Sequence, residues 1–226
     1  MYKRQLLTHP VKDPGEEVHR SDHYLRVIED YGIAVEDRRG HLRLMENDVE
    51  GINKKLEARG IGPQDDLIVF NTGGNWHLKR WPLALWAQLA RRISASAKLK
   101  IVFSGAVKDK ADADQVIKEA GINAINFAGE TTLGESLALF SRAKVVVSAD
   151  SGPLHLADSI GAATVGIFGP TRPEITGPRG TGEAVVLFKD VGCNQAPCYH
   201  LSCGNNVCMQ SIGVEDVWQA LQKFIR

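Results

Sequence analysis

The chain has 226 residues, 43% of them hydrophobic, and its 27 basic side chains balance 27 acidic ones, so its formal net charge at pH 7 is zero. This size suits one large domain, or one domain with part of another, and a neutral chain lacks the basic excess of a protein that binds nucleic acid through bulk charge. No apolar run is long enough to cross a bilayer and no signal-peptide core is visible, so a cytoplasmic protein is expected.

The first part of the chain is polar and weakly patterned. Apolar side chains at helical spacing predict a helix over 21–31 and a second short helix over 48–59. Between them, residues 36–47 are charged and predict a short edge strand or a linker. We interpret residues 1–64 as the remnant of one domain with a linker, and residues 65–226 as a compact second domain.

From residue 65 onward, short apolar runs alternate with amphipathic segments of helical length. Strands are expected over 67–71, 99–103, 124–127, 144–147, 164–168 and 184–188, and helices over 82–94, 108–120, 133–141, 154–162 and 214–225. Trp81 precedes a helix with an apolar stripe and is expected to pack against it. This alternation predicts the α/β class, as a Rossmann-like doubly wound parallel sheet with right-handed crossovers.

A polar turn separates the expected strand over 144–147 from the helix that follows. Asp150 or Ser151 suits the N-cap position, Pro153 suits the first helical turn, and Gly152 allows a ligand to approach the backbone closely. The unpaired N–H groups and the positive end of the helix dipole then form a site suited to phosphate. A well-capped helix without a ligand is the alternative.

The same turn lies at a strand end, which is where open parallel sheets bind their ligands. Asp150, Ser151 and His155 are expected to line one lip of a crevice, and Gly169 and Thr171 the next. His155 follows Ser151 by four residues, so both face the same side of the helix start. This histidine could contact the ligand or have a structural role.

The segment NTGGNWHLKRWP follows the first strand of the compact domain. Gly73 and Gly74 allow a tight backbone approach, and Asn75 offers amide hydrogen bonds. Lys79 and Arg80 are cations near the start of a helix, where the dipole disfavours them, so an anionic ligand would explain their place. A solvated pair of basic residues is the alternative. The spacing is neither Walker A nor G-x-G-x-x-G, so a dinucleotide fingerprint is not supported.

The loop over 127–132 ends another strand. Glu130 could bond a ribose or cap the next helix. Thr131 and Thr132 are ordinary N-cap residues, and capping is the expected role for one of them. Thr132 is also counted below among the candidate binding residues.

Four cysteines lie close together near the end of the chain, five residues apart: Cys193, Cys198, Cys203 and Cys208. Thiols that pack a loop are favoured. The gaps of four residues lie at the edge of the range for structural zinc, and His200 could add a ligand. Two disulfides are a third alternative, which a reducing cytosol disfavours.

Several motifs in order resemble glycosyltransferase family 9, the family of ADP-heptose:lipopolysaccharide heptosyltransferases. They are KRWP at 79–82, DSGPLHLADSIGAATVGIFGPT at 150–171 and CMQSIGVEDVWQAL at 208–221, and HRSDHYLRVIEDYGI at 19–33 resembles the piece before the family's inter-domain linker. The resemblance implies a GT-B fold, in which two Rossmann-like domains face each other across a cleft. This chain would then be the C-terminal, donor-binding half with an N-terminal truncation.

The resemblance also implies residue roles. Lys79 would contact the diphosphate of the donor and Asp150 its sugar, and both are the candidate catalytic residues. The candidate binding residues are Gly74, Asn75, Lys79, Thr132, Asp150, Ser151, Gly152 and His155, and no metal site is implied. Asn75 falls where members often carry Ser or Thr, and an acidic donor contact of some members falls at Val107, which leaves the sugar open.

As to function, the resemblance implies an inverting, metal-independent transfer of a sugar to a lipopolysaccharide core acceptor. ADP-heptose is the expected donor, no other cofactor is expected, and a lipid-linked acceptor implies a peripheral place at the cytoplasmic face of the inner membrane. The family's proposed aspartate base has no counterpart in residues 1–47. The alternatives are a nucleotide-sugar binding module without turnover and a GT-B nucleotide-sugar epimerase.

Overall fold

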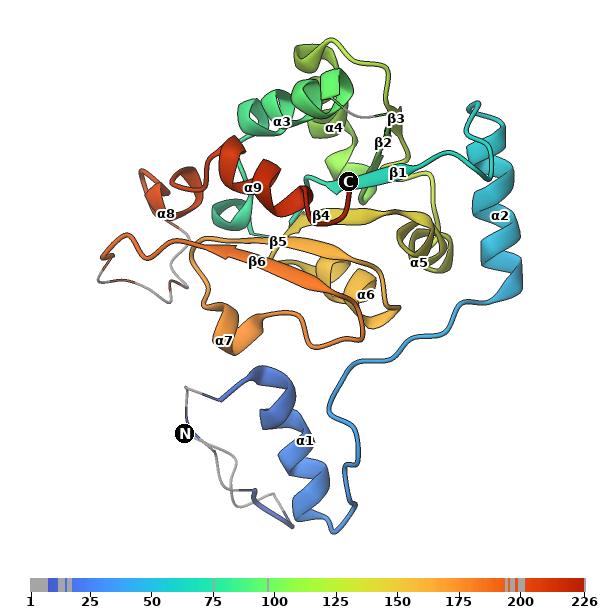
Figure 1. Ribbon diagram of the computed structural model, residues 1–226. Helices are drawn as coiled ribbons and strands as arrows, with labels where there is room; N and C mark the ends of the chain where they lie inside the picture. The colour runs from blue at the N-terminus through green and yellow to red at the C-terminus, as the bar shows by residue number, and fades with distance from the viewer. Residues whose placement is uncertain are drawn as a thin grey trace.

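The protein is represented by a computed structural model that describes residues 8–11, 15, 18–74, 76–96, 98–193, 195, 198 and 202–225. At its centre is a six-stranded sheet in the order β3-β2-β1-β4-β5-β6, in which every neighbouring pair is parallel (Figure 1). The strands are β1 (Leu67–Asn71), β2 (Lys100–Ser104), β3 (Ile125–Asn126), β4 (Val145–Ala149), β5 (Thr164–Phe168) and β6 (Ala184–Phe188). The predicted α/β class with a doubly wound parallel sheet is confirmed.

Helices cover both faces of this sheet. One apolar cluster joins the sheet to α3 (Leu83–Ser96), α4 (Lys110–Ala120) and α9 (Val214–Leu221). A second cluster on the opposite face joins it to α2 (Glu46–Glu57), α5 (Leu133–Arg142) and α6 (Gly152–Ser159). The central strands β1 and β4 are buried along their whole length, which explains why both read as continuous apolar runs.

The helix α2 is part of the packed sheet domain. Its Ile52 and Leu56 are buried and lie in the same apolar cluster as residues of α5. An ion pair of 2.6 Å between Lys55 Nζ and Glu135 Oε2 joins the two helices as well. The helix predicted over 48–59, within the region interpreted as a domain remnant with a linker, therefore contributes to the core of the sheet domain.

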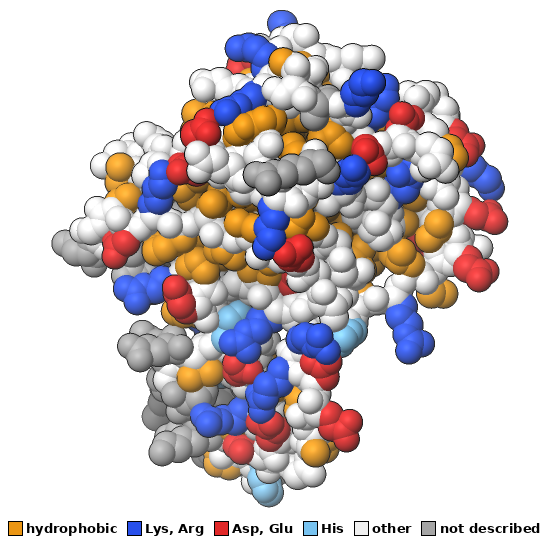
Figure 2. Space-filling model, in the orientation of Figure 1, with side chains coloured by type: hydrophobic (Ala, Val, Ile, Leu, Met, Phe, Trp, Pro, Cys, Tyr) orange, Lys and Arg blue, Asp and Glu red, His pale blue; other side chains and the backbone are white. Residues whose placement is uncertain are grey.

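The helix α1 (Arg20–Asp30) lies apart from the sheet, joined to α2 by an extended stretch that is neither helix nor strand (Figure 1). None of its side chains is buried, and Tyr24 and Tyr31 are exposed. Two contacts attach it to the loop after α7 (Pro173–Thr176): Nε2 of the N-cap His19 lies 3.0 Å from the Gly177 carbonyl oxygen, and Arg179 pairs with Asp22 at 2.8 Å. Basic and acidic side chains gather on this segment (Figure 2).

The topology fixes where a ligand can enter. From β1 the chain moves outward through β2 to β3, and it then returns to place β4 on the other side of β1. The direction of winding therefore reverses between β1 and β4, and the loops at their carboxyl ends diverge and leave a crevice. Lys79 follows β1 and Asp150 follows β4. Among the described helices, none is long and apolar enough to cross a membrane.

Candidate functional site

A pocket of about 570 Å³ opens at this reversal point, within the usual range for small-molecule sites. Its walls come from the loops after β1, β2 and β4 and from the start of α6. The predicted residues that line it are Gly74, Lys79, Asp150, Ser151 and Gly152. Three turns far apart in the sequence therefore meet around one cavity, as the strand-end argument predicts.

An ion pair forms part of the pocket wall. Nζ of Lys79 lies 2.7 Å from Oδ2 of Asp150, with the Lys79 side chain 20% exposed and that of Asp150 4% exposed. Lys79 ends the short 3-10 helix His77–Lys79, and its Nζ also lies 5.7 Å from the centre of the Trp76 ring. The cation is thus held in place while part of it still faces the cavity.

Three further side chains surround the Asp150 carboxylate. Thr171 donates to Oδ2 at 2.6 Å, Thr176 donates to the same oxygen at 3.2 Å, and His155 Nε2 lies 3.4 Å from Oδ1. Burial would raise the pKa of Asp150, but the hydrogen bonds from His155, Lys79 and Thr171 outweigh it and lower the pKa to about 2. The carboxylate is therefore charged across the physiological range.

The neighbouring cation has a different role. Arg80 donates from Nε and Nη2 to the Gly74 carbonyl at 3.1 and 2.9 Å, and from Nη1 to Asp112 at 2.9 Å. These bonds hold the glycine loop after β1 against α4. Of the two cations that the sequence marks, Lys79 lines the pocket and Arg80 supports its wall.

The start of α6 forms the opposite wall. Ser151 occupies the N-cap position and Pro153 lies in the first turn, as predicted. A Cβ built at Gly152 would meet nothing within 4 Å, so the backbone here is open to a ligand. Ser151 Oγ lies 3.1 Å from Ser148 Oγ, which fixes the turn against β4. These features are suited to bind the oxygens of a phosphate at the helix start.

The remaining predicted residues fall elsewhere. Thr132 caps α5 in a reciprocal box, accepting from Glu135 N at 3.1 Å while its own N–H donates to Glu135 Oε2 at 2.8 Å. Its neighbour Thr131 lines the pocket. Asn75 lies outside the described residues, and His155 acts at the site through Asp150. The binding role of Thr132 stays a prediction.

Sequence reasoning missed part of the site. Thr176, which bonds Asp150, sits in the short helix α7, and Ser104 and Lys108 line the pocket from the end of β2. The available signal was position: Ser104 ends β2 and Lys108 follows it, and β2 adjoins β1, so both residues lie at the same carboxyl edge of the sheet.

A family model described as Glycosyltransferase family 9 (heptosyltransferase) matches residues 22–206. The chain belongs to glycosyltransferase family 9. It is 28% identical over 162 residues to lipooligosaccharide heptosyltransferase 2 of Campylobacter jejuni, an alignment that covers 70% of this chain and 51% of the relative. It is 30% identical over 141 residues to lipopolysaccharide heptosyltransferase 1 of Pseudomonas aeruginosa, covering 62% of this chain and 38% of the relative.

Solved structures agree with the family assignment. The glycosyl transferase family 9 structure from Veillonella parvula superposes with a TM-score of 0.83 and 26% identity, covering 98% of this chain and 64% of that chain. The structure of E. coli ADP-heptose lipopolysaccharide heptosyltransferase II superposes with a TM-score of 0.66 and 22% identity. The match covers 82% of this chain and 53% of that chain and shows the shared fold. The sheet of this family 9 chain is thus the Rossmann-like sheet of GT-B glycosyltransferases. The chain spans about half the length of the first curated relatives that it matches.

Proposed function

We propose that this family 9 chain carries the donor site of a heptosyltransferase-like glycosyltransferase, which transfers a sugar from a nucleoside diphosphate sugar to a lipopolysaccharide core acceptor. The observation that carries the proposal is the Lys79–Asp150 pair at 2.7 Å, which spans the reversal point of the sheet beside the open start of α6. A cation and a helix start together suit a diphosphate, and a charged carboxylate beside them suits sugar hydroxyls.

The proposed reaction is the inverting transfer that the family resemblance implies. An acceptor hydroxyl attacks the anomeric carbon, its C–O bond forms as the bond to the diphosphate oxygen breaks, and attack from the opposite face inverts the centre. The hydroxyl proton passes to a base, and the nucleoside diphosphate leaves with the bonding pair. Lys79 and the first-turn N–H groups of α6 stabilise the charge that grows on the leaving oxygen, and donors of this kind contribute about 3–4 kcal/mol in other enzymes.

The two carboxylate oxygens of Asp150 differ: one is occupied by hydrogen bonds within the protein, and we infer that the other is available to the substrate. Oδ2 already accepts from Lys79, Thr171 and Thr176, whereas Oδ1 faces the half-buried His155 at 3.4 Å. A sugar hydroxyl would therefore reach Oδ1, and His155 would stand beside it. Because the pKa of Asp150 is about 2, this acid acts as a hydrogen-bond acceptor and not as a proton donor.

We propose ADP-heptose as the donor, with no cofactor besides it, and a lipid-linked saccharide as the acceptor. Relatives named as heptosyltransferases, and an E. coli heptosyltransferase solved with ADP, support this choice. An acceptor anchored in lipid would place the protein at the membrane surface.

A nucleotide-sugar binding module without turnover is the second candidate, because the contacts around Lys79 and Asp150 account for donor binding and none of them is assigned as the base. Family membership favours both candidates over the epimerase. Two experiments distinguish the transferase from the binding module. The chain is titrated with ADP, ADP-heptose, UDP and GDP, and ADP release is then assayed with a deacylated core acceptor. Selective adenine-nucleotide binding with ADP release supports the transferase, and binding without release supports the module. Binding of none of the four contradicts the donor site.

A further inference from the structure

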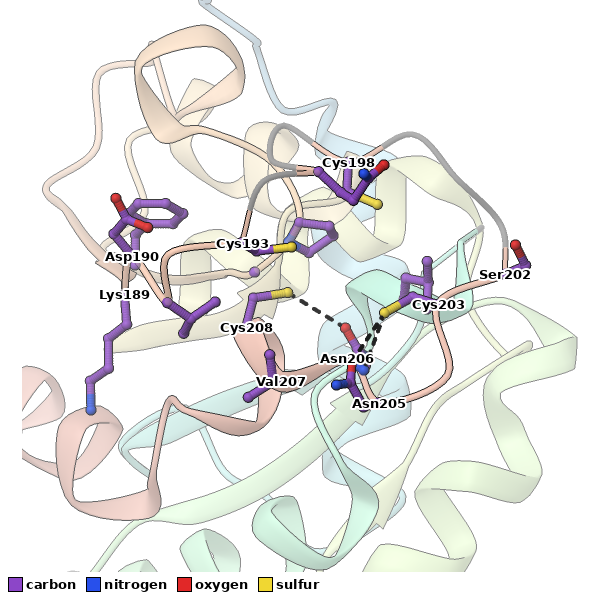
Figure 3. Close-up of a pocket in the computed structure, with 16 residues that line it drawn as sticks. Lys189, Asp190, Cys193, Cys198, Ser202, Cys203, Asn205, Asn206, Val207 and Cys208 are labelled. Atoms are coloured by element: carbon purple, nitrogen blue, oxygen red, sulfur yellow. Dashed lines mark hydrogen bonds between the residues drawn. The ribbon is translucent and has the colours of Figure 1, made fainter.

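A second cavity, of about 370 Å³, is lined by all four cysteines of the chain (Figure 3). Two of its lining residues are chain neighbours of donor-site residues. Leu78 and Pro170 line it, while their chain neighbours Lys79 and Thr171 belong to the cluster around Asp150. All four cysteines are thiols in the structure, and the proposed transfer reaction uses none of them.

Cys203 has the features of a reactive thiol. It is exposed, its Sγ accepts a hydrogen bond from the Asn206 N–H at 3.4 Å, and the Sγ lies 3.5 Å from Oδ1 of Asn205. Backbone hydrogen bonds from Asn205 and Asn206 lower the pKa of the Cys203 thiol. Because the thiolate is the nucleophile in thiol chemistry, an exposed thiol of lowered pKa is the first of a group to react.

Cys208 is placed to be its partner. It is half-buried at the start of α8 (Val207–Gln210), and its Sγ donates to Oδ1 of Asn206 at 3.7 Å. Figure 3 shows the sulfurs of Cys203 and Cys208 on either side of the Asn206 amide. Burial raises the pKa of Cys208, and the charge of Cys203 raises it further, with a smaller effect from Cys193. Of the other cysteines, Cys203 therefore has the largest electrostatic effect on the pKa of Cys208.

The loop that carries these thiols is tied to the donor site. The Cys198 N–H donates to the Pro170 carbonyl at 2.7 Å, one residue before Thr171. Met209, next to Cys208, is buried against Gly169, where an added Cβ would come within 2.7 Å of the Met209 sulfur. The cysteine loop is thus in contact, through Met209 and Pro170, with the segment whose Thr171 bonds Asp150.

We propose that Cys203 and Cys208 are an oxidisable thiol pair that forms a reversible intrachain disulfide by exchange with a small-molecule disulfide. The Cys203 thiolate attacks one sulfur of the oxidant, forms a mixed disulfide and releases the first small thiol. Cys208, deprotonated, then attacks Sγ of Cys203 and releases the second. Two protons and two electrons pass from the pair to the oxidant, which is reduced to two thiols.

The test uses the full chain with glutathione disulfide as the oxidant. After oxidation, unreacted thiols are blocked with iodoacetamide, the protein is reduced, and newly exposed thiols are labelled with N-ethylmaleimide and located by tandem mass spectrometry. The wild type and the matched control Cys193→Ser should carry label at Cys203 and Cys208. Cys208→Ser should stop at a mixed disulfide on Cys203. Cys203→Ser should react at least about tenfold more slowly, as expected when the low-pKa thiol is removed.

Two results would overturn the proposal. One is label spread evenly over the four cysteines, or placed on Cys193 and Cys198. The other is stoichiometric zinc or iron in the purified protein, with all four thiols protected until a chelator is added. Within the described part of the chain, no group of three or more His, Cys, Asp or Glu side chains is arranged to hold a metal ion. Neither readout depends on nucleotide binding, so the thiol pair and the donor site are tested separately.

Discussion

Thr171 Oγ1 donates a hydrogen bond of 2.6 Å to Oδ2 of Asp150 across 21 residues of sequence. Both side chains are buried, and the bond joins the loop after β5 to the loop after β4. The threonine therefore fixes the orientation of the carboxylate that also pairs with Lys79. It is a positioning residue for the donor site rather than a group that meets the substrate.

Substitutions of Thr171 can distinguish the contribution of its hydroxyl group from that of its side-chain shape. Thr171→Val keeps the shape and removes the hydroxyl, so we expect a loss of about 1.5–3 kcal/mol in the free energy of unfolding, typical of a hydrogen bond to a charged group. The affinity for ADP-heptose should fall as well, and Thr171→Ser should restore both. Urea unfolding and calorimetry measure the two quantities. A valine variant as stable as the wild type would show that the bond does not stabilise the fold.

The charge of Asp150 predicts a pH dependence of stability. Its folded pKa, about 2, lies below the ordinary value of 3.8, so the folded state binds the proton less tightly than the unfolded state. The carboxylate thus stabilises the fold above about pH 4, and this contribution, about 2 kcal/mol, is lost as the pH falls toward 2.

Other carboxylates titrate in the same window, so the wild type must be compared with Asp150→Asn. We expect the difference in unfolding free energy between the two proteins to shrink between pH 6 and pH 3, where both are still folded. A difference that does not change with pH would mean that Asp150 titrates normally in the folded protein.

The capping box at α5 predicts different outcomes for two adjacent threonines. Thr132→Ala removes the N-cap hydroxyl that accepts from Glu135, so it should cost about 1 kcal/mol of stability. If capping is its whole role, affinity for ADP should not change. Thr131→Ala, at the pocket wall, is the matched comparison and should lower affinity more than Thr132→Ala does. Loss of affinity in Thr132→Ala would instead confirm its predicted binding role.

The sequence predicted the sheet well because each strand is a short apolar run between helices. The strands predicted over 67–71, 164–168 and 184–188 agree with β1, β5 and β6 at both ends. The strand predicted over 124–127 is only two residues long in the structure, because β3 pairs with β2 over Ile125 and Asn126 alone. Trp81 packs as predicted: it is buried, and its ring centre lies 5.2 Å from that of Trp86.

The pairing inside the site was beyond sequence reasoning. Lys79 and Asp150 are 71 residues apart, and only the strand order, which places β4 beside β1, brings them together. Lys79 and Arg80 cannot be told apart in the sequence. Their roles differ because Arg80 bonds Asp112, which belongs to the distant helix α4. Long-range contacts of this kind depend on topology, which local patterns do not encode.

The central claim is that Lys79 supplies the positive charge for the donor's diphosphate, and titration of the full chain with ADP tests it most directly. Lys79→Gln can still donate to Asp150 but carries no charge, and Lys54→Gln removes an exposed lysine of α2 as the matched control. We predict that ADP binds the wild type and Lys54→Gln equally, and binds Lys79→Gln at least about tenfold more weakly, a difference of about 1.4 kcal/mol. Equal affinity in all three proteins, with circular dichroism showing each folded, would contradict the account.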